Sequence, residues 1–182
     1  MDAIKKLLQC CDGVMMDAAH IWLIRALVAC LKPMDILEIG VGSGAGTDAI
    51  LQAATYNGNG ARVTCVDNFL DWGGAAPSGI ESIPVKLIVK SERDFIDSCQ
   101  AKFDFIVSDA DHDHSHEWIA KTMGLLNHGG VAVFHDVSNS DYPNLEAIIS
   151  FMRWAEHPHF VFKASSRPDE RCERGLLVVF KA

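Results

Sequence analysis

Positive charge is scarce and dispersed in this sequence. The 16 lysines and arginines are outnumbered by 24 aspartates and glutamates, which gives a formal net charge of −8, and they form no basic run. A surface that follows a nucleic-acid backbone needs an excess of Lys and Arg, because affinity there depends on neutralising phosphates. The composition therefore argues against a nucleic-acid partner and favours a small-molecule substrate.

Long apolar runs and paired cysteines are also lacking. The longest apolar stretch, residues 21–31, is interrupted by Arg25 and is too short to span a bilayer, so we expect no membrane partner. The six cysteines form no C-x-x-C motif, which favours reduced thiols in the cytoplasm over a disulfide framework. Acidic Asp2 and the lack of an A-x-A site after an apolar region predict no secretory signal.

Neither an internal repeat nor a low-complexity segment divides the chain. Its 182 residues are enough for one hydrophobic core and too few for a second catalytic domain, so we expect a single domain over residues 1–182. Residues 1–34 are predicted to form two helices, over 2–9 and 15–31, and residues 35–182 to form the cofactor-binding α/β core. The second helix is apolar nearly all round, which leaves burial in the monomer and self-association through the N-terminal helices both open.

A strand, a glycine-rich turn and a helix are predicted from residues 35–47, DILEIGVGSGAGT. The apolar run at the start has the length of one buried strand, and four glycines fall in the next seven positions. Glycine tolerates positive φ and lets the backbone approach a ligand closely. Apolar residues at helical spacing after the turn predict a helix whose free N–H groups face it. This arrangement is typical of a nucleotide site, although a structural turn that binds nothing stays open.

Glu38 bears on which nucleotide is bound. Gly40-x-Gly42-x-x-Ala45 fits the dinucleotide fingerprint, which is weak evidence when it stands alone. A carboxylate at Glu38 would repel a pyrophosphate but suits a ligand with a positive amino group. The pattern E-x-G-x-G-x-G resembles motif I of the class I S-adenosylmethionine (SAM)-dependent methyltransferases, whose cofactor carries an ammonium and a sulfonium. The resemblance implies SAM as the cofactor, and an NAD(P)-dependent oxidoreductase is the less favoured alternative.

Two further strands are predicted beside the glycine turn. The first covers residues 62–66 and ends at Asp67, where one carboxylate can accept hydrogen bonds from both hydroxyls of a ribose. The second covers 84–89, and in the resembling enzymes residues just past it face the adenine, which implies Ser91 here. The residues expected to bind the cofactor are Glu38, Gly40, Gly42, Ser43, Gly44, Thr47, Asp67, Asn68, Phe69, Ser91, Asp109 and Ala110. A loop over 70–82 is predicted on the substrate side.

Aspartates and histidines alternate after the fourth predicted strand, residues 103–108. The stretch begins DADHDHSHE at position 109, and a calcium loop is excluded because its sixth position is His114 rather than Gly. A fifth strand is predicted over 131–134, after a turn at 127–130, and it ends in His135-Asp136. The carboxyl ends of adjacent parallel strands meet, so Asp109, His135 and Asp136 could share one divalent ion such as Mg²⁺ or Mn²⁺.

FDFIVSDADH and LLNHGGVAVFHD together resemble the cation-dependent O-methyltransferases, which include the catechol, caffeoyl-CoA and macrocin enzymes. The resemblance implies that Asp109, His135 and Asp136 hold the metal, and that His112 takes the substrate proton from outside the metal's ligand shell. His135 stands where those families more often have Asp or Glu, which shifts the preference toward Mn²⁺, Fe²⁺ or Zn²⁺. A structural role for these residues stays open, and His114, His116 and His128 are expected to face solvent.

Alternating strands and helices predict an α/β fold. An apolar stripe over 145–152 predicts a helix that covers the sheet, and 159–164 with 175–181 are expected to form a hairpin. The resemblance implies a Rossmann-like, doubly wound sheet of seven strands, mostly parallel with an antiparallel last strand. Residues 35–40 should then lie beside residues 103–108. A nicotinamide dehydrogenase would instead continue with a sixth βα unit.

These features predict a SAM-dependent methyltransferase that methylates a hydroxyl of a small molecule, with divalent-metal assistance. A binding protein of the same fold, which holds SAM or a related nucleoside without turnover, is the alternative.

The cofactor prediction can be checked by thermal denaturation. We expect S-adenosylhomocysteine (SAH) to raise the melting temperature and NADH to leave it unchanged, because Glu38 favours an ammonium over a pyrophosphate. A clear shift with NADH and none with SAH would contradict the prediction.

Overall fold

The computed structural model of the protein describes residues 16–70, 84–163 and 174–182. The helix expected over residues 2–9 and nearly all of the loop expected over 70–82 lie outside these residues.

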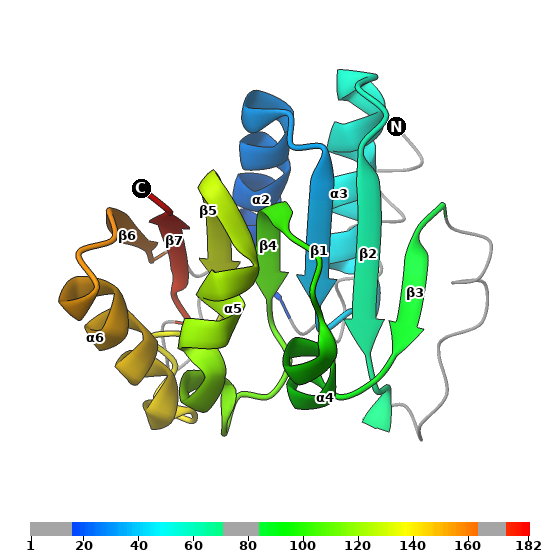
Figure 1. Ribbon diagram of the computed structural model, residues 1–182. Helices are drawn as coiled ribbons and strands as arrows, with labels where there is room; N and C mark the ends of the chain where they lie inside the picture. The colour runs from blue at the N-terminus through cyan, green and yellow to red at the C-terminus, as the bar shows by residue number, and fades with distance from the viewer. Residues whose placement is uncertain (1–15, 71–83, 164–173) are drawn as a thin grey trace.

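One sheet of seven strands runs through the molecule, in the order β3-β2-β1-β4-β5-β7-β6 (Figure 1). Strands β1 to β5 pair in parallel, whereas β7 pairs antiparallel with both β5 and β6. The strands are β1 (Asp35–Ile39), β2 (Arg62–Asp67), β3 (Lys86–Val89), β4 (Phe103–Ser108), β5 (Leu126–Phe134), β6 (His159–Phe162) and β7 (Leu176–Phe180). The prediction of a Rossmann-like, mostly parallel sheet with an antiparallel terminal hairpin is confirmed, as is the pairing of β1 with β4. Within this sheet β6, rather than β7, forms the edge.

Helices cover both faces of the sheet. In the part of the chain that the structure describes, α2 (Ala18–Leu31) and α3 (Ala45–Asn57) lie on one face (Figure 1). The other face carries α4 (Glu92–Ser98), α5 (Ile119–Leu125) and α6 (Glu146–Trp154). The 3₁₀ turns η3 (Ser115–Trp118) and η4 (Pro143–Leu145) lead into α5 and α6. The helix predicted over 145–152 corresponds to η4 and α6, and its apolar stripe is buried.

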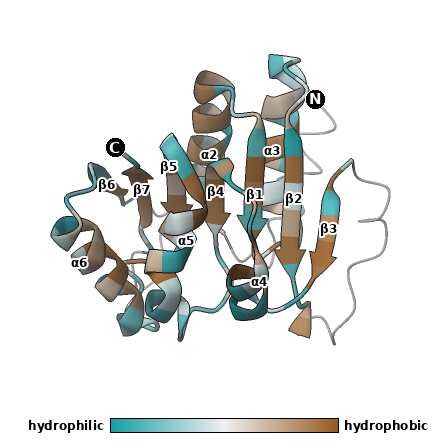
Figure 2. Ribbon diagram, viewed as in Figure 1, coloured by the Kyte–Doolittle hydropathy of each residue, from teal (hydrophilic) through white to brown (hydrophobic). Residues whose placement is uncertain are grey.

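The central strands are apolar along most of their length (Figure 2) because both of their faces are covered. Successive residues point to opposite faces, so Ile36 packs in the cluster with α2 and α3, while Leu37 packs in the cluster with α4 and α5. The sheet is therefore held from both sides, and its carboxyl-terminal edge is a fixed platform for the residues that follow the strands.

Helix α2 begins at Ala18, with Asp17 in the N-cap position, and not at residue 15. It buries one face against the sheet and α3, whereas Trp22 on the other side is 55% exposed. Burial in the monomer thus accounts for one side of this apolar helix, and self-association through the exposed side stays a prediction. Among the described residues, none of the helices combines the length and the apolar character needed to cross a bilayer.

The turn predicted over residues 127–130 is wrong, because these residues belong to β5. The pairing with β4 shifts there: Phe103 lies opposite Leu126, yet Phe105 lies opposite Val131. Gly129 has a φ of +76°, and its N–H donates to the carbonyl of Lys181 at 2.8 Å. The glycines therefore accommodate an irregularity inside a strand and do not interrupt it.

The glycine turn after β1 passes directly over the end of β4. Gly40 has a φ of +87°, and a Cβ at this position would lie 2.1 Å from the carbonyl oxygen of Asp109. Gly44 has a similar φ of +84°, but a Cβ there would meet nothing within 4 Å. Only glycine at position 40 lets the turn and the carboxyl end of β4 approach this closely.

These two glycines form a matched pair for mutation. Gly44→Ala should cost about 1–2 kcal/mol of stability, the strain of a left-handed backbone carrying a Cβ. Gly40→Ala should cost roughly 1–3 kcal/mol more, because it adds a clash with backbone that cannot move freely. Urea denaturation without ligand measures both, and equal losses in the two variants would contradict the close contact.

Candidate active site

A cavity of about 520 Å³ opens at the carboxyl-terminal ends of β1, β2, β3 and β4. It straddles β1 and β4, where the strand order reverses, which is the usual binding crevice of a doubly wound sheet. Its size suits a small organic ligand. The expected cofactor-binding residues that line it are Glu38, Gly40, Gly42, Ser43, Asp67, Asn68, Ser91, Asp109 and Ala110. The other three do not line it: Gly44 caps α3, while Thr47 and Phe69 are each 1% exposed.

Glu38 lies beneath the glycine turn, almost fully buried. Thr47 Oγ1 donates to its Oε2 at 2.5 Å, and Cys65 Sγ donates to the same oxygen at 3.3 Å. A Cβ on Gly46 would come within 2.6 Å of Oε1, so the first turn of α3 closes over the carboxyl group. Burial raises the pKa of Glu38 to about 7, against the lowering effect of the hydrogen bonds from Thr47 and Cys65.

Asp67 holds the glycine turn. Its Oδ2 accepts from the backbone N–H groups of Val41 at 2.7 Å and Gly42 at 3.0 Å, and its Oδ1 accepts from the N–H of Phe69 at 2.7 Å. The side chain lines the cavity, as expected for a ribose-binding group, and it also fixes the loop that the ligand would rest on. The sequence predicted that Asp67 would lie at the ligand site, but it did not predict that Asp67 would hold the glycine turn.

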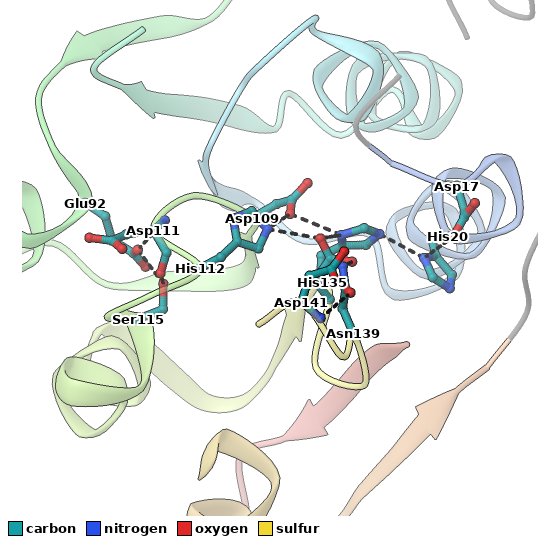
Figure 3. Close-up of polar contacts among 11 residues, drawn as sticks. Asp17, His20, Glu92, Asp109, Asp111, His112, Ser115, His135, Asn139 and Asp141 are labelled. Atoms are coloured by element: carbon teal, nitrogen blue, oxygen red, sulfur yellow. Dashed lines mark hydrogen bonds and ion pairs between the residues drawn. The ribbon is translucent and has the colours of Figure 1, made fainter. Parts of the chain in front are cut away.

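Asp109, His112, His135 and Asp136 come together at the carboxyl ends of β4 and β5. Figure 3 shows Asp109, His112 and His135 facing one another there. The Nε2 atom of His112 lies 3.1 Å from Asp109 Oδ1 and 3.1 Å from Asp136 Oδ2. The Nδ1 atom of His135 lies 3.1 Å and 3.3 Å from the same two oxygens. The predicted meeting of Asp109, His135 and Asp136 thus takes place in the structure.

Local backbone structure aims these groups at one another. Asp136 has a φ of +60°, a left-handed conformation that Asp tolerates better than most residues. Asn139 Nδ2 donates to its Oδ1 at 3.2 Å, which leaves Oδ2 facing the histidines. The N–H of Asp109 donates to the carbonyl of Ile39 at 2.8 Å and continues the pairing of β4 with β1.

The four side chains stabilise one another's charged forms. Burial lowers the pKa of His112, but hydrogen bonds and charge from Asp109 and Asp136 outweigh it and raise the value to about 10. For His135 burial is again opposed by the charge of Asp109, and its pKa also rises to about 10. Burial would raise the pKa of Asp109, yet the charge of His135 and the hydrogen bond with His112 hold it well below its usual range. The cluster is therefore a compact group of paired opposite charges.

The donor set fits a divalent cation. One atom from each of Asp109, His112, His135 and Asp136 lies within 4.8 Å of the others. His135 Nδ1 is buried and makes no hydrogen bond of acceptable geometry among the described residues, despite its short distances to both carboxylates. An imidazole nitrogen of His135 beside two carboxylate oxygens favours Mn²⁺, Fe²⁺ or Zn²⁺ over Mg²⁺.

His112 was expected to lie outside the ligand shell of the metal, and this stays a prediction. In the structure its Nε2 lies between carboxylate oxygens of Asp109 and Asp136. Its ring also packs on Tyr142, with centroids 4.5 Å apart, and both residues line the cavity. Of the other histidines, His114 and His128 are exposed as expected and His116 is half-buried.

Two buried residues near the cluster were not anticipated. His20 of α2 contacts His135, with 2.9 Å between Nδ1 and Nε2 (Figure 3). Glu92 accepts from the hydroxyls of Ser108 at 3.1 Å and Ser115 at 2.6 Å and from the N–H of Asp111 at 3.2 Å, so it holds the loop that carries His112. The sequence did offer one indication for His20, because it is an ionisable residue on the apolar face of a predicted helix. No sequence pattern indicated that Glu92 lies near the cluster.

Comparison with known proteins bears on this site. A family model described as a methyltransferase domain matches residues 37–137, which include the glycine turn and all four members of the cluster. No curated protein matches the chain.

Solved structures share the fold at low sequence identity. TomG, an O-methyltransferase of Streptomyces achromogenes involved in tomaymycin synthesis and solved with SAM, is 16% identical with a TM-score of 0.72, over 100% of this chain and 91% of that one. An O-methyltransferase from Bacillus cereus in complex with SAH is 18% identical with a TM-score of 0.71, again over 100% and 91%. A putative caffeoyl-CoA O-methyltransferase from Staphylococcus aureus is 15% identical with a TM-score of 0.68, over the same shares. At these identities the likeness concerns the fold.

Glu38 predicts a specific pH dependence of stability. Its pKa is raised from 4.5 to about 7 in the folded protein, so the neutral carboxyl contributes stability that is complete below pH 4.5 and is lost as the pH rises to about 7. The loss is on the order of 3 kcal/mol at full burial. Glu38→Gln should remove this loss, so the difference in denaturation midpoint between the variant and the wild type should change between pH 4.5 and about 7.

Thr47→Val serves as the control, because it removes a hydrogen bond that lowers the pKa of Glu38. In this variant the loss should continue to a pH above 7. A Glu38→Gln protein with the wild-type pH dependence would show that Glu38 is not the group responsible.

Proposed function

This chain belongs to a family of methyltransferase domains, and from that premise we propose that it transfers the methyl group of SAM to a hydroxyl of a small molecule, assisted by a divalent cation. Methylation of a hydroxyl is supported by the cluster of Asp109, His112, His135 and Asp136. Two of its members, Asp109 and His112, also line the cavity.

SAM as the methyl donor is supported by the cavity. It lies at the β1/β4 crevice, against the glycine turn, and the turn's backbone is kept in place by Asp67. The carboxyl group of Glu38 beneath the turn provides a partner for an ammonium group. SAM and SAH occupy the structures of TomG and of the Bacillus cereus enzyme, respectively, which share this fold.

The methyl transfer is an in-line displacement. The acceptor oxygen forms a bond to the methyl carbon while the bond from that carbon to the sulfonium sulfur breaks, which leaves SAH. A neutral hydroxyl is a weak nucleophile, so its proton must leave as the new bond forms. We assign this proton to Nε2 of His112, the cluster's most exposed member at 24% of its side chain.

Asp109, His135 and Asp136 are the residues that would hold the cation. When bound there, a divalent ion would offset the two carboxylate charges that keep His112 protonated and stabilise negative charge on the acceptor oxygen. The protein's own contribution is positioning. Tyr142 packs against the His112 ring, and Glu92 fixes the loop from Asp111 to Ser115 that carries it.

Two variants separate the role of the ligands from that of the base. Asp136→Ala should abolish Mn²⁺-dependent transfer of labelled methyl from SAM to probe acceptors such as catechol and caffeate, while SAH affinity stays within a few-fold. His112→Ala should slow transfer by roughly 10²-fold or more, the usual contribution of a general base, and should retain Mn²⁺ binding. Calorimetry with SAH and Mn²⁺ provides the two affinities.

Three outcomes would contradict parts of the proposal. Full activity after treatment with a chelator would show that the reaction needs no divalent cation. Loss of Mn²⁺ binding in His112→Ala would make His112 a metal ligand in place of a base. Tight SAH binding without transfer to any hydroxyl compound would favour a protein that binds the cofactor without turnover.

A further inference from the structure

His20 occupies a fully buried position between helix α2 and the sheet. It is 0% exposed and lies on the buried face of the helix with Ile24 and Val28. Its ring meets that of His135 edge-on, with centroids 5.0 Å apart and an interplanar angle of 77°, and it contacts Phe162 of β6 in a similar way at 5.8 Å. Packing from both sides therefore fixes the orientation of the His20 ring.

The contact between the two histidines requires a proton. Nδ1 of His20 and Nε2 of His135 lie 2.9 Å apart, which is hydrogen-bond distance, so one nitrogen must carry a hydrogen and the other must accept it. Among the described residues, His20 is the hydrogen-bond partner of His135 Nε2. Asp17 Oδ2 lies 3.8 Å from His20 Nδ1, too far to determine which nitrogen is the donor.

The two directions of this hydrogen bond have different consequences at the other end of the His135 ring. If His20 donates, His135 keeps its own proton on Nδ1, which then points at Asp109 and Asp136 and cannot bind a cation. If His135 donates from Nε2, its Nδ1 can give up its proton to solvent when a cation arrives and then presents a lone pair to the position between the two carboxylates. Only the second arrangement makes His135 a metal ligand.

We propose that His20 is a positioning residue for the metal site: its Nδ1 accepts the Nε2–H of His135 and so holds His135 in the tautomer and ring orientation that direct Nδ1 at the cation. The proposal rests on the divalent cation of the proposed function, and it extends the site to a helix that precedes the family-matched segment 37–137. Metal-bound histidines generally donate their second N–H to a protein acceptor, and loss of that acceptor weakens metal binding.

A pair of nearly isosteric substitutions tests this role. Asn carries an oxygen near the position of His Nδ1, whereas Leu has similar size and no acceptor. His20→Leu should weaken Mn²⁺ binding about 10–100-fold, measured from the free-ion electron paramagnetic resonance signal, while His20→Asn stays within about three-fold of wild type. SAH affinity and melting temperature, measured for each variant, show whether the fold and the cofactor cavity are intact.

Nitrogen-15 NMR of the wild-type protein with Zn²⁺, a diamagnetic ion, tests the hydrogen bond directly and needs no variant to fold. We expect the proton on Nε2 of His135 and none on Nδ1 of His20. A proton on His20 Nδ1, or unchanged Mn²⁺ affinity in a folded His20→Leu, would overturn the role of His20 and leave the metal site intact. Absence of Mn²⁺ binding by the wild type would overturn both the metal site and the role of His20.

Discussion

The glycine turn and the carboxyl end of β4 lie in direct contact, and the geometry of the site depends on this. Gly40 leaves no room for a side chain beside the Asp109 carbonyl, and Asp67 holds the same turn through two backbone N–H groups. The parallel pairing of β1 with β4 therefore sets the distance between the glycine turn, which lines the cavity, and Asp109. Because Asp109 lines the cavity and also belongs to the charged cluster, one contact positions both parts of the site.

Burial of charge is the second constraint. Asp109, His135 and Asp136 are nearly inaccessible, and such groups stay charged only when opposite charges lie close by. The histidines supply those charges in the protein alone, and a divalent cation would supply them in a loaded enzyme. A site built in this way is held together without the ion, through the positions of β4, β5 and α2, and keeps its donor atoms within reach of one another.

Residues 35–47 and the strand ends at Asp67, Asp109 and His135-Asp136 were readable from the sequence, because their signals are local: an apolar run followed by glycine or by acidic residues. The turn at 127–130 was wrong because glycines signal a break in regular structure equally well for a turn and for a bulge inside a strand. The contact of His20 with His135 spans 115 residues of sequence. It depends on how α2 packs on the sheet, which no local pattern specifies.

Crystals grown with SAH and Mn²⁺, with anomalous diffraction recorded at the manganese edge, would test the central claim most directly. The account predicts SAH in the cavity at the β1/β4 crevice and one anomalous peak in contact with Asp109 Oδ1, His135 Nδ1 and Asp136 Oδ2. SAH in the cavity with no peak at these atoms, and with the histidines still paired to the carboxylates, would contradict a metal-assisted enzyme.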